Sequence, residues 1–211
     1  MSDTPRKRQP RMPIEARRDQ ILDAALRLIS ESGYAEASME AIAREAAIAK
    51  PRVYAAYPGR GPLLHALLQR EEGRVIAALA TSMPPLNDGI DFEQTLLAAA
   101  SNLLTAVADD PSPWRLLMAP TEGAPAEVHT HIQAGMHFAL ARLRELVEIG
   151  AETRLALDGL DVDLASRALL AVGERAVRDL LSDPTEFSAD RYVDFLRDVV
   201  ARVAGGHAVD P

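Results

Sequence analysis

The stretch AIAREAAIAKPRVYAAY, residues 41–57, decides the fold because it predicts two short helices separated by three residues. The first six residues are good helix formers, and the pattern stops at Ala47-Ile48-Ala49. It resumes at Lys50, and Pro51 stands where the first turn of a helix tolerates proline. Two of the four tyrosines of the chain fall on the second helix, together with Lys50 and Arg52. This spacing is typical of a helix-turn-helix.

One further helix is expected before this pair. From Ile14 onward, apolar residues recur on one face with a 3.6-residue period. Gly33 follows the last of them and suits a left-handed C-terminal cap. Ser38 is suited to cap the next helix, because its hydroxyl can accept a hydrogen bond from a free backbone N–H. Three helices with this spacing are expected to form a small domain whose third helix can lie in the major groove of DNA.

In that placement, the first turn of the third helix faces base edges. We expect Arg52 to form two hydrogen bonds with a guanine, and Lys50 to reach a base or a phosphate. The hydroxyls of Tyr54 and Tyr57 are expected to donate to phosphates while their rings pack against the first helix. The alternative is that the three helices pack as part of an all-α domain without touching DNA.

A longer segment resembles the DNA-binding domain of TetR-family repressors: RRDQILDAALRLISESGYAEASMEAIAREAAIAKPRVYAAYPGRGPLLHALL, residues 17–68. The resemblance rests on an Ile-Leu-Ala-Ala-Leu helix, Gly33-Tyr34, Ile42-Ala43 and Leu63-Leu64. It implies a homodimer that binds double-stranded operator DNA and responds to a small molecule. It also implies a set of DNA-binding residues: Ser38, Lys50, Pro51, Arg52, Tyr54, Tyr57 and Arg60.

The segment also departs from the family pattern. Ala47 stands where the turn glycine is usual, and Ala49 replaces a serine that often caps the third helix. Ala55-Ala56 replaces bulky or histidine residues, and Gly61 replaces an acidic residue. These losses remove phosphate contacts, so we expect greater reliance on the remaining basic residues. A left-handed residue at position 47 is expected to cost roughly 1 kcal/mol without glycine.

The remainder of the chain predicts further helices and no strands. We expect an all-α protein of about nine helices in three parts. Residues 1–13 are a disordered basic arm, residues 14–60 the helix-turn-helix domain, and residues 61–211 a larger helical domain for ligand binding and dimerisation. The later helices are expected at about 62–80, 91–108, 114–119, 126–151, 162–181 and 189–204.

Charge is distributed unevenly along the 211 residues. Residues 1–80 hold 13 Lys and Arg against 10 Asp and Glu, whereas residues 81–211 hold 10 against 21. A basic front and an acidic body indicate two functions. The basic residues of the arm either enter the minor groove or serve only as a solubilising tail.

The last two predicted helices are the expected dimer interface. One recognition helix contacts only a few base pairs, whereas two related by a two-fold axis bind a palindrome. Apolar and small residues along both helices would form a four-helix bundle with their mates. The interface residues we expect are Leu164, Ala168, Leu169, Val172, Tyr192, Leu196 and Val199. The alternative is that these faces are buried within one subunit.

Large or soft apolar residues on the middle helices predict a cavity for a hydrophobic or amphipathic effector, such as a drug, a lipid or an acyl compound. Each of them is also consistent with ordinary core packing. The ligand-binding residues we expect are Leu103, Trp114, Met118, Met136, His137, Phe138 and Glu174.

Other functions have less support. The sequence has no cysteine and no HExxH, GxSxG, P-loop or GxGxxG motif, so we expect neither an enzyme nor a cofactor. His129 and His131 stand at i and i+2, where helical side chains point apart, so we expect no metal site. No apolar run is long enough to span a membrane, and we expect a cytoplasmic protein. The main alternative is a helical ligand carrier or adaptor that does not bind DNA.

Overall fold

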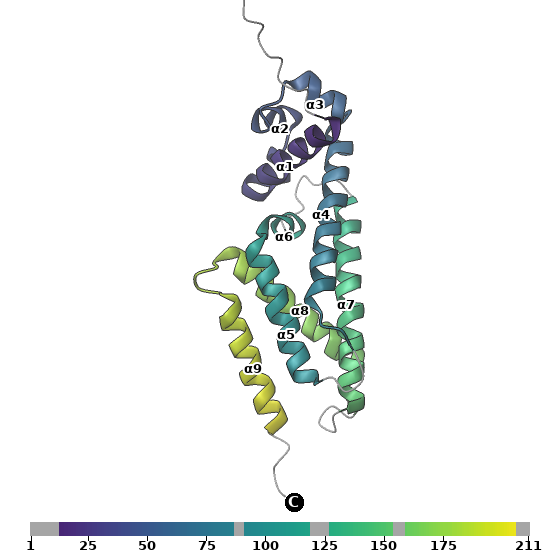
Figure 1. The fold of residues 1–211 in the computed structure, drawn as a ribbon, viewed down its shortest axis with the longest axis vertical. Coiled ribbons are helices and arrows are strands. Elements are labelled where there is room, and N and C mark those ends of the chain that lie inside the picture. The colour runs from purple at the N-terminus through teal and green to yellow at the C-terminus, as the bar shows by residue number, and fades with distance from the viewer. Residues whose placement is uncertain (1–12, 87–90, 119–126, 154–158, 206–211) are drawn as a thin grey trace, which may run out of the picture. The chain divides into compact units, whose positions relative to one another are not determined.

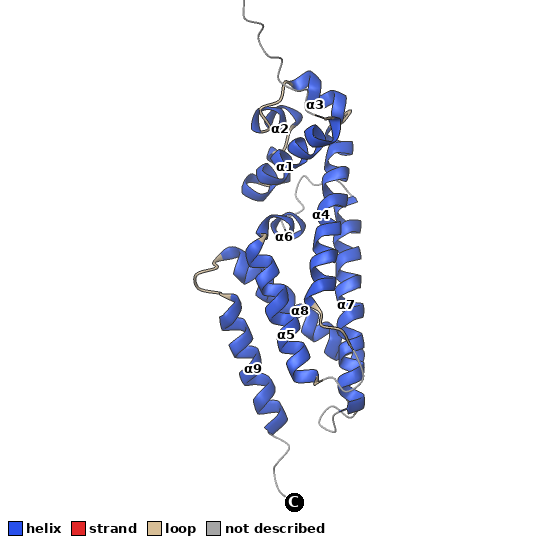
Figure 2. Ribbon diagram, in the orientation of Figure 1, coloured by secondary structure: helices blue, strands red, loops and turns tan. Residues whose placement is uncertain are grey.

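The computed structural model describes residues 13–86, 91–118, 127–153 and 159–205. All regular structure within these ranges is helical, so the predicted all-α class is confirmed (Figure 2). The helices are shown in Figure 1 and have these bounds: α1 Ile14–Ser32, α2 Met39–Glu45, α3 Lys50–Ala56, α4 Arg60–Ser82, α5 Phe92–Asp109, α6 Pro111–Met118, α7 Glu127–Thr153, α8 Val162–Ser182 and α9 Ala189–Gly205.

The chain divides into two units, and the division falls within α4. The first unit extends to Leu67 and the second begins at Leu68. The first therefore continues seven residues beyond the predicted boundary at residue 60. Its extension contains Leu63, Leu64 and Leu67, which are all fully buried. The predicted basic arm, residues 1–13, lies outside the described residues except for Pro13.

In the first unit, α1 packs against α2 and α3. Gly33 ends α1 with a φ of 84°, in the region that favours glycine, and its N–H donates to the carbonyl of Ile29. Ser38 caps α2 as expected, because its hydroxyl accepts a hydrogen bond from the N–H of Ala41 at 3.1 Å. Gln20 joins α1 to the end of α2 by donating from Nε2 to the carbonyl of Ala46 at 2.8 Å.

In the second unit, α5 packs against α6, α7, α8 and α9. Capping side chains start several of these helices: Asp91 accepts from the N–H of Gln94, and Asp161 accepts from the N–H of Leu164. The contact of α5 with α7 is close. A β-carbon on Gly150 would lie 2.4 Å from Cδ2 of Phe92, so this position accepts only glycine without rearrangement.

The predicted start of the short sixth helix was wrong. We expected a break through residues 109–113 and a helix from Trp114, but α6 begins at Pro111. Prolines at positions 111 and 113 are compatible with a helix there, because the first turn does not use their missing N–H groups. None of the helices within the described ranges has the length and apolar character needed to cross a membrane.

Candidate DNA-binding site and ligand cavity

The helix-turn-helix is held together by side chains that α2 and α3 bury. Ile42 and Val53 are fully buried, and Ala43 and Ala46 are nearly so. Ile48, in the turn between α2 and α3, is half-buried. The small side chain of Ala43 lets the two helices approach closely. This packing fixes α3 on α1 and α2 and determines which of its side chains reach solvent.

The turn between the helices contains the left-handed residue that the sequence analysis expected at position 47. Ala47 has a φ of 53°, and among the described residues no other non-glycine residue has a positive φ. Its side chain therefore stands in the left-handed region that L-residues adopt at a cost. Ala49 precedes α3 as its N-cap residue and provides no side-chain hydrogen bond. Both departures from the family pattern thus leave a local weakness in the turn.

Four of the predicted DNA-binding residues form the exposed face of α3, which we call the recognition face: Lys50, Pro51, Arg52 and Tyr54. Tyr54 is 43% exposed, whereas Val53 and Ala56 of the same helix are buried. The guanidinium of Arg52 forms no ion pair or hydrogen bond with the residues that the structure describes. It is therefore available to a ligand outside the domain.

Lys50 has a partner that the sequence analysis missed. Its Nζ forms an ion pair with a carboxylate oxygen of Glu40 in the first turn of α2. Both side chains are about half exposed. The hydrogen bond with Lys50 lowers the pKa of Glu40, and the same bond raises the pKa of Lys50. A spacing of ten residues gives no helical periodicity, so no local pattern revealed this pair.

Two predicted DNA contacts need correction. Tyr57 is only 2% exposed, and the guanidinium of Arg18 lies 4.6 Å from the centre of its ring, so this tyrosine anchors α3 inside the domain. Arg60 is half-buried and donates to two backbone carbonyls: from Nε to Ala37 at 3.0 Å and from Nη2 to Tyr34 at 2.5 Å. Its charge thus holds the α1–α2 connection. Ser38 is exposed at the start of α2.

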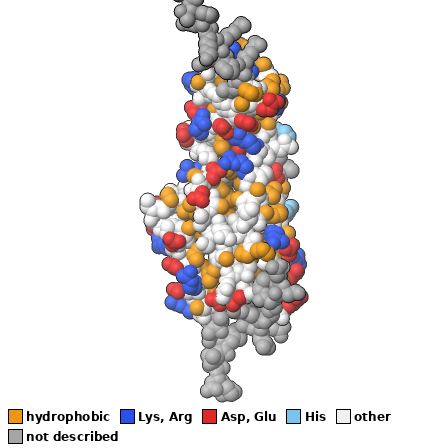
Figure 3. Space-filling view, viewed as in Figure 1, with side chains coloured by type: hydrophobic (Ala, Val, Ile, Leu, Met, Phe, Trp, Pro, Cys, Tyr) orange, Lys and Arg blue, Asp and Glu red, His pale blue; other side chains and the backbone are white. Residues whose placement is uncertain are grey.

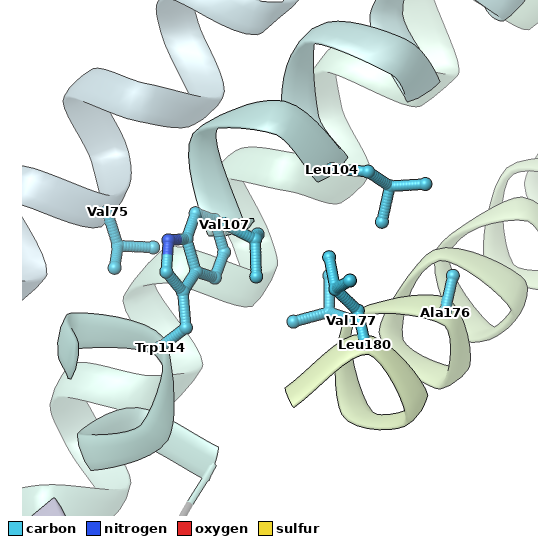
Figure 4. Close-up of a cluster of buried hydrophobic side chains, with 7 residues drawn as sticks. All are labelled: Val75, Leu104, Val107, Trp114, Ala176, Val177 and Leu180. Atoms are coloured by element: carbon cyan, nitrogen blue, oxygen red, sulfur yellow. The ribbon is translucent and has the colours of Figure 1, made fainter. Parts of the chain in front are cut away.

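The second unit contains a cavity of about 270 Å³ whose walls are mainly apolar. A cluster of buried side chains from four helices lies beside it and contributes Val75, Leu104, Trp114, Ala176 and Val177 to the lining. Figure 4 shows the indole of Trp114 in this cluster, near Val75 and Val107. Six of the seven predicted ligand-binding residues line this cavity: Leu103, Trp114, Met118, Met136, Phe138 and Glu174. The prediction for His137 is wrong, because its side chain is exposed and does not belong to the lining.

Charged groups at the cavity were partly missed. Besides Glu174, the lining includes Arg142 of α7 and Arg178 of α8. The carboxylate of Glu174 and the guanidinium of Arg178 have no partner among the described residues. Arg178 stands one helical turn after Glu174, which is the signal that would have placed it on the same wall.

Several predicted interface residues also belong to the cavity wall: Leu169, Val172, Tyr192 and Leu196. Tyr192 is half-buried, and its hydroxyl donates to Asp179 at 2.5 Å, joining α9 to α8. Burial and this hydrogen bond raise its pKa to about 12. Their place in a dimer interface therefore stays a prediction, and the open alternative of burial within one subunit has support at Leu169, Tyr192 and Leu196.

Part of α8 and α9 remains exposed and apolar. Leu164, Val172 and Val199 are 64%, 52% and 39% exposed, and Ala168 is also exposed. Phe195, which the sequence analysis did not select, is 60% exposed. Hydrophobic side chains also lie among the charged groups where the second unit faces the viewer in Figure 3. We call the set Leu164, Ala168, Val172, Phe195 and Val199 the α8–α9 face.

Metal ligands do not cluster in the part of the chain whose side chains are described. The side chains of His129 and His131 lie outside that part, so the prediction of no metal site there stays a prediction.

The comparison with known families agrees with this geometry. Residues 21–67, which include the whole helix-turn-helix and the later part of the supporting helix α1, match the family described as bacterial regulatory proteins, tetR family. Over these residues the chain is similar to the tetR family. This similarity favours a DNA-binding regulator over a ligand carrier, because the matched proteins are regulatory proteins.

Three relatives illustrate how far the similarity extends. The transcriptional activator FasR of Mycolicibacterium smegmatis is 29% identical over 111 residues, which cover 53% of this chain and 49% of FasR. A TetR-like regulator from Rhodococcus sp. RHA1 is 28% identical, with a TM-score of 0.72 over 95% of this chain and 100% of that one. FadR of Bacillus subtilis, solved with stearoyl-CoA, has the same fold at 20% identity, with a TM-score of 0.66 over 89% and 98%.

Proposed function

We propose that this protein is a ligand-responsive transcriptional regulator of the tetR family, acting as a repressor. It binds a palindromic operator as a homodimer and is released by a hydrophobic or amphipathic small molecule. The observation that carries the proposal is the recognition face, where Arg52 and Tyr54 are exposed on a helix whose other side is buried. An exposed tyrosine beside an arginine without an ion pair contributes little to packing, so these two side chains favour contact with another molecule.

DNA recognition follows from the chemistry of this face. The guanidinium of Arg52 can donate two hydrogen bonds to O6 and N7 of a guanine. The hydroxyl of Tyr54 can donate to a phosphate, and such contacts position the helix without selecting a sequence. Ser38 and Pro51 lie at the edge of the same surface and are proposed to approach the backbone of the duplex. Such a partner places the protein in the cytoplasm, where the chromosome is.

Dimerisation is proposed to use the α8–α9 face. A face that exposes Leu164 and Phe195 to this extent is unfavourable in water unless another surface covers it. A second copy covers the same patch on both chains, because a two-fold interface is self-complementary. The two recognition helices of such a dimer contact half-sites about 34 Å apart, one turn of the duplex.

The effector is proposed to occupy the apolar cavity. Its walls suit a hydrocarbon or aromatic body, and Glu174, Arg142 and Arg178 offer charged groups for a polar head. FadR with its stearoyl-CoA shows that an acyl compound can be the ligand of this fold. Val172 and Phe195 both line the cavity and belong to the α8–α9 face, so dimerisation would also close one side of the cavity.

Release from DNA is proposed to follow a two-state equilibrium of the dimer. One state matches the spacing of the half-sites, and the effector binds the other state more tightly. The effector shifts the equilibrium only by the difference between its two affinities.

Selection of bound sequences from a random DNA pool tests this function. We expect a palindrome whose half-sites are centred one helical turn apart. Arg52→Ala should weaken binding of the selected duplex by about 1–3 kcal/mol and relax the preference at one position of each half-site. Arg115→Ala, which changes an exposed arginine of α6, is the matched control and should leave binding unchanged. The absence of any sequence preference at low salt would refute the proposal.

A panel of fatty acids, acyl-CoA thioesters and hydrophobic drugs tests the effector class by shifts of the melting temperature. A compound that raises the melting temperature should also release the selected duplex. Stabilisation without release would show that the cavity is not coupled to DNA binding.

A further inference from the structure

We propose that Glu40 is a specificity-determining residue: its carboxylate holds the ammonium group of Lys50 away from phosphates and so suppresses binding to non-operator DNA. The inference rests on the proposed DNA-binding function. It concerns a residue that carries no positive charge and was not among the expected DNA contacts.

The geometry places Glu40 where it can compete with DNA. Its carboxylate forms the ion pair with Lys50 Nζ at the border of the recognition face, and both side chains remain about half exposed. Lys50 is the first residue of α3. Glu40 lies in the first turn of α2, where the N-terminal partial positive charge of that helix stabilises a carboxylate. The exposed charged side chains of the α2–α3 segment include Arg44 and Arg52 as well as the acid Glu45.

The orientation of α3 explains why Lys50 needs such a partner. The N-terminus of a helix carries a partial positive charge, which disfavours a cation in its first turn. The ammonium group is therefore better placed beside an anion, either a phosphate of DNA or the carboxylate of Glu40. Because the carboxylate is already in contact, a phosphate has to compete with it for the donors of Lys50.

This exchange affects the two kinds of DNA differently. Non-specific complexes are held by phosphate contacts alone, so the loss of one lysine from those contacts weakens them directly. In the operator complex, base contacts by Arg52 fix the orientation of α3 in the groove, and in that orientation Lys50 stays paired with Glu40. Glu40 therefore lowers the affinity for non-operator DNA more than the affinity for the operator.

The inference is tested with full-length Glu40→Gln, which keeps the shape of the side chain and removes its charge. Affinities for a fluorescent duplex of random sequence, and for the duplex selected above, are measured by anisotropy over a range of salt concentrations. We expect Glu40→Gln to bind the random duplex about 3-fold to 10-fold more tightly. The slope of log affinity against log salt should steepen by about 0.9, the value for one added phosphate contact.

Glu45→Gln is the matched control. Glu45 is also an exposed carboxylate of α2 in an ion pair, but its partner is Arg27 of α1 at 2.8 Å. Both variants change the net charge equally, so a general effect of charge affects both alike. The second control is Lys50→Gln, in whose background Glu40→Gln should leave the slope for the random duplex unchanged.

The outcomes for the two variants of α2 distinguish the inference from a general effect of charge. The inference holds if Glu40→Gln, but not Glu45→Gln, steepens the slope and lowers the ratio of selected to random affinity. Equal effects of the two variants, or an undiminished effect of Glu40→Gln without Lys50, would overturn it while leaving the proposed function intact. Failure of the unaltered protein to bind either duplex at low salt would instead refute the proposed function, and with it this inference.

Discussion

Replacement of Arg60 by alanine should loosen the DNA-binding unit rather than merely remove a phosphate contact. The arginine donates two charge-assisted hydrogen bonds, to the carbonyls of Tyr34 and Ala37, and it is half-buried. A hydrogen bond to a charged group contributes about 1.5–3 kcal/mol. Because water can reach part of this site and replace the lost donor, we expect a total loss of about 2–3 kcal/mol for the two bonds.

Hydrogen exchange measured by mass spectrometry is the suitable assay, because it reports on peptides of α1 and α2 separately from the second unit. A loss of 2–3 kcal/mol corresponds to exchange that is about 30-fold to 150-fold faster. Arg52→Ala is the control: it should leave exchange unchanged and weaken binding of the selected duplex. If Arg60→Ala leaves exchange unchanged but flattens the salt dependence of DNA binding by about 0.9, the residue contacts a phosphate and our interpretation is wrong.

Four further predictions concern single positions. Ala47→Gly should slow exchange in α2 and α3 several-fold, because relief of about 1–2 kcal/mol of strain exceeds the added flexibility of glycine; faster exchange would contradict the strain. Gly150→Ala should lower the melting temperature, with a cost of about 1–3 kcal/mol for overpacking against Phe92, and Phe92→Leu should restore part of it. Leu103→Trp should fill the cavity and abolish effector-induced melting shifts while DNA binding persists; retained shifts would place the effector elsewhere. Hydrogen bonds lower the pKa of Asp179 below its ordinary 3.8, so the stability that unaltered protein has over Asp179→Asn should be present above that pH and disappear as the pH falls further, as measured by urea unfolding; an advantage that persists in acid would contradict it.

The DNA-binding unit was predictable because its determinants are local. The residues that end and begin its helices act within one turn of their own position. Gly33 and Ser38 have conformations that their residue types favour, and Ala47 has a positive φ that is unfavourable for alanine. The exposed and buried faces of α3 follow from the helical period once its start at Lys50 is known. The prediction for Tyr57 was wrong because it was based on the hydroxyl group, which favours contact with solvent or DNA. The residue directly follows α3, and its side chain is buried.

The pairs across the fold were not predictable in this way. Lys50 meets Glu40, and Arg60 meets the carbonyls of Tyr34 and Ala37, only because the chain folds back on itself. A sequence shows which residues carry charge, but it does not show which of them form ion pairs or hydrogen bonds within the folded protein. Lys50 and Arg60 are both basic, and we expected both to contact DNA.

For the cavity, the residue types of the middle helices predicted most of the lining. They did not predict that some lining residues also belong to the exposed α8–α9 face. Periodicity assigns one face of a helix to the interior, whereas α8 contributes to a cavity and also exposes Leu164 and Val172. Val172 lines the cavity and is also exposed, and helical periodicity assigns a residue only to one of these two environments. The same residue is therefore expected to be sensitive to both dimerisation and effector binding.

Helix α4 connects these features within one continuous element. Its first turns belong to the first unit, and Val75, Leu79 and Ser82 further along line the cavity of the second. Between them lies Glu71, fully buried and bonded to the guanidinium groups of Arg70 and Arg74. Arg74 also pairs with Asp110, which follows α5, so a buried carboxylate and two cations fix this stretch of α4 to its neighbours. Because an uncompensated buried charge is costly, α4 is expected to move as a rigid element rather than to bend at this point.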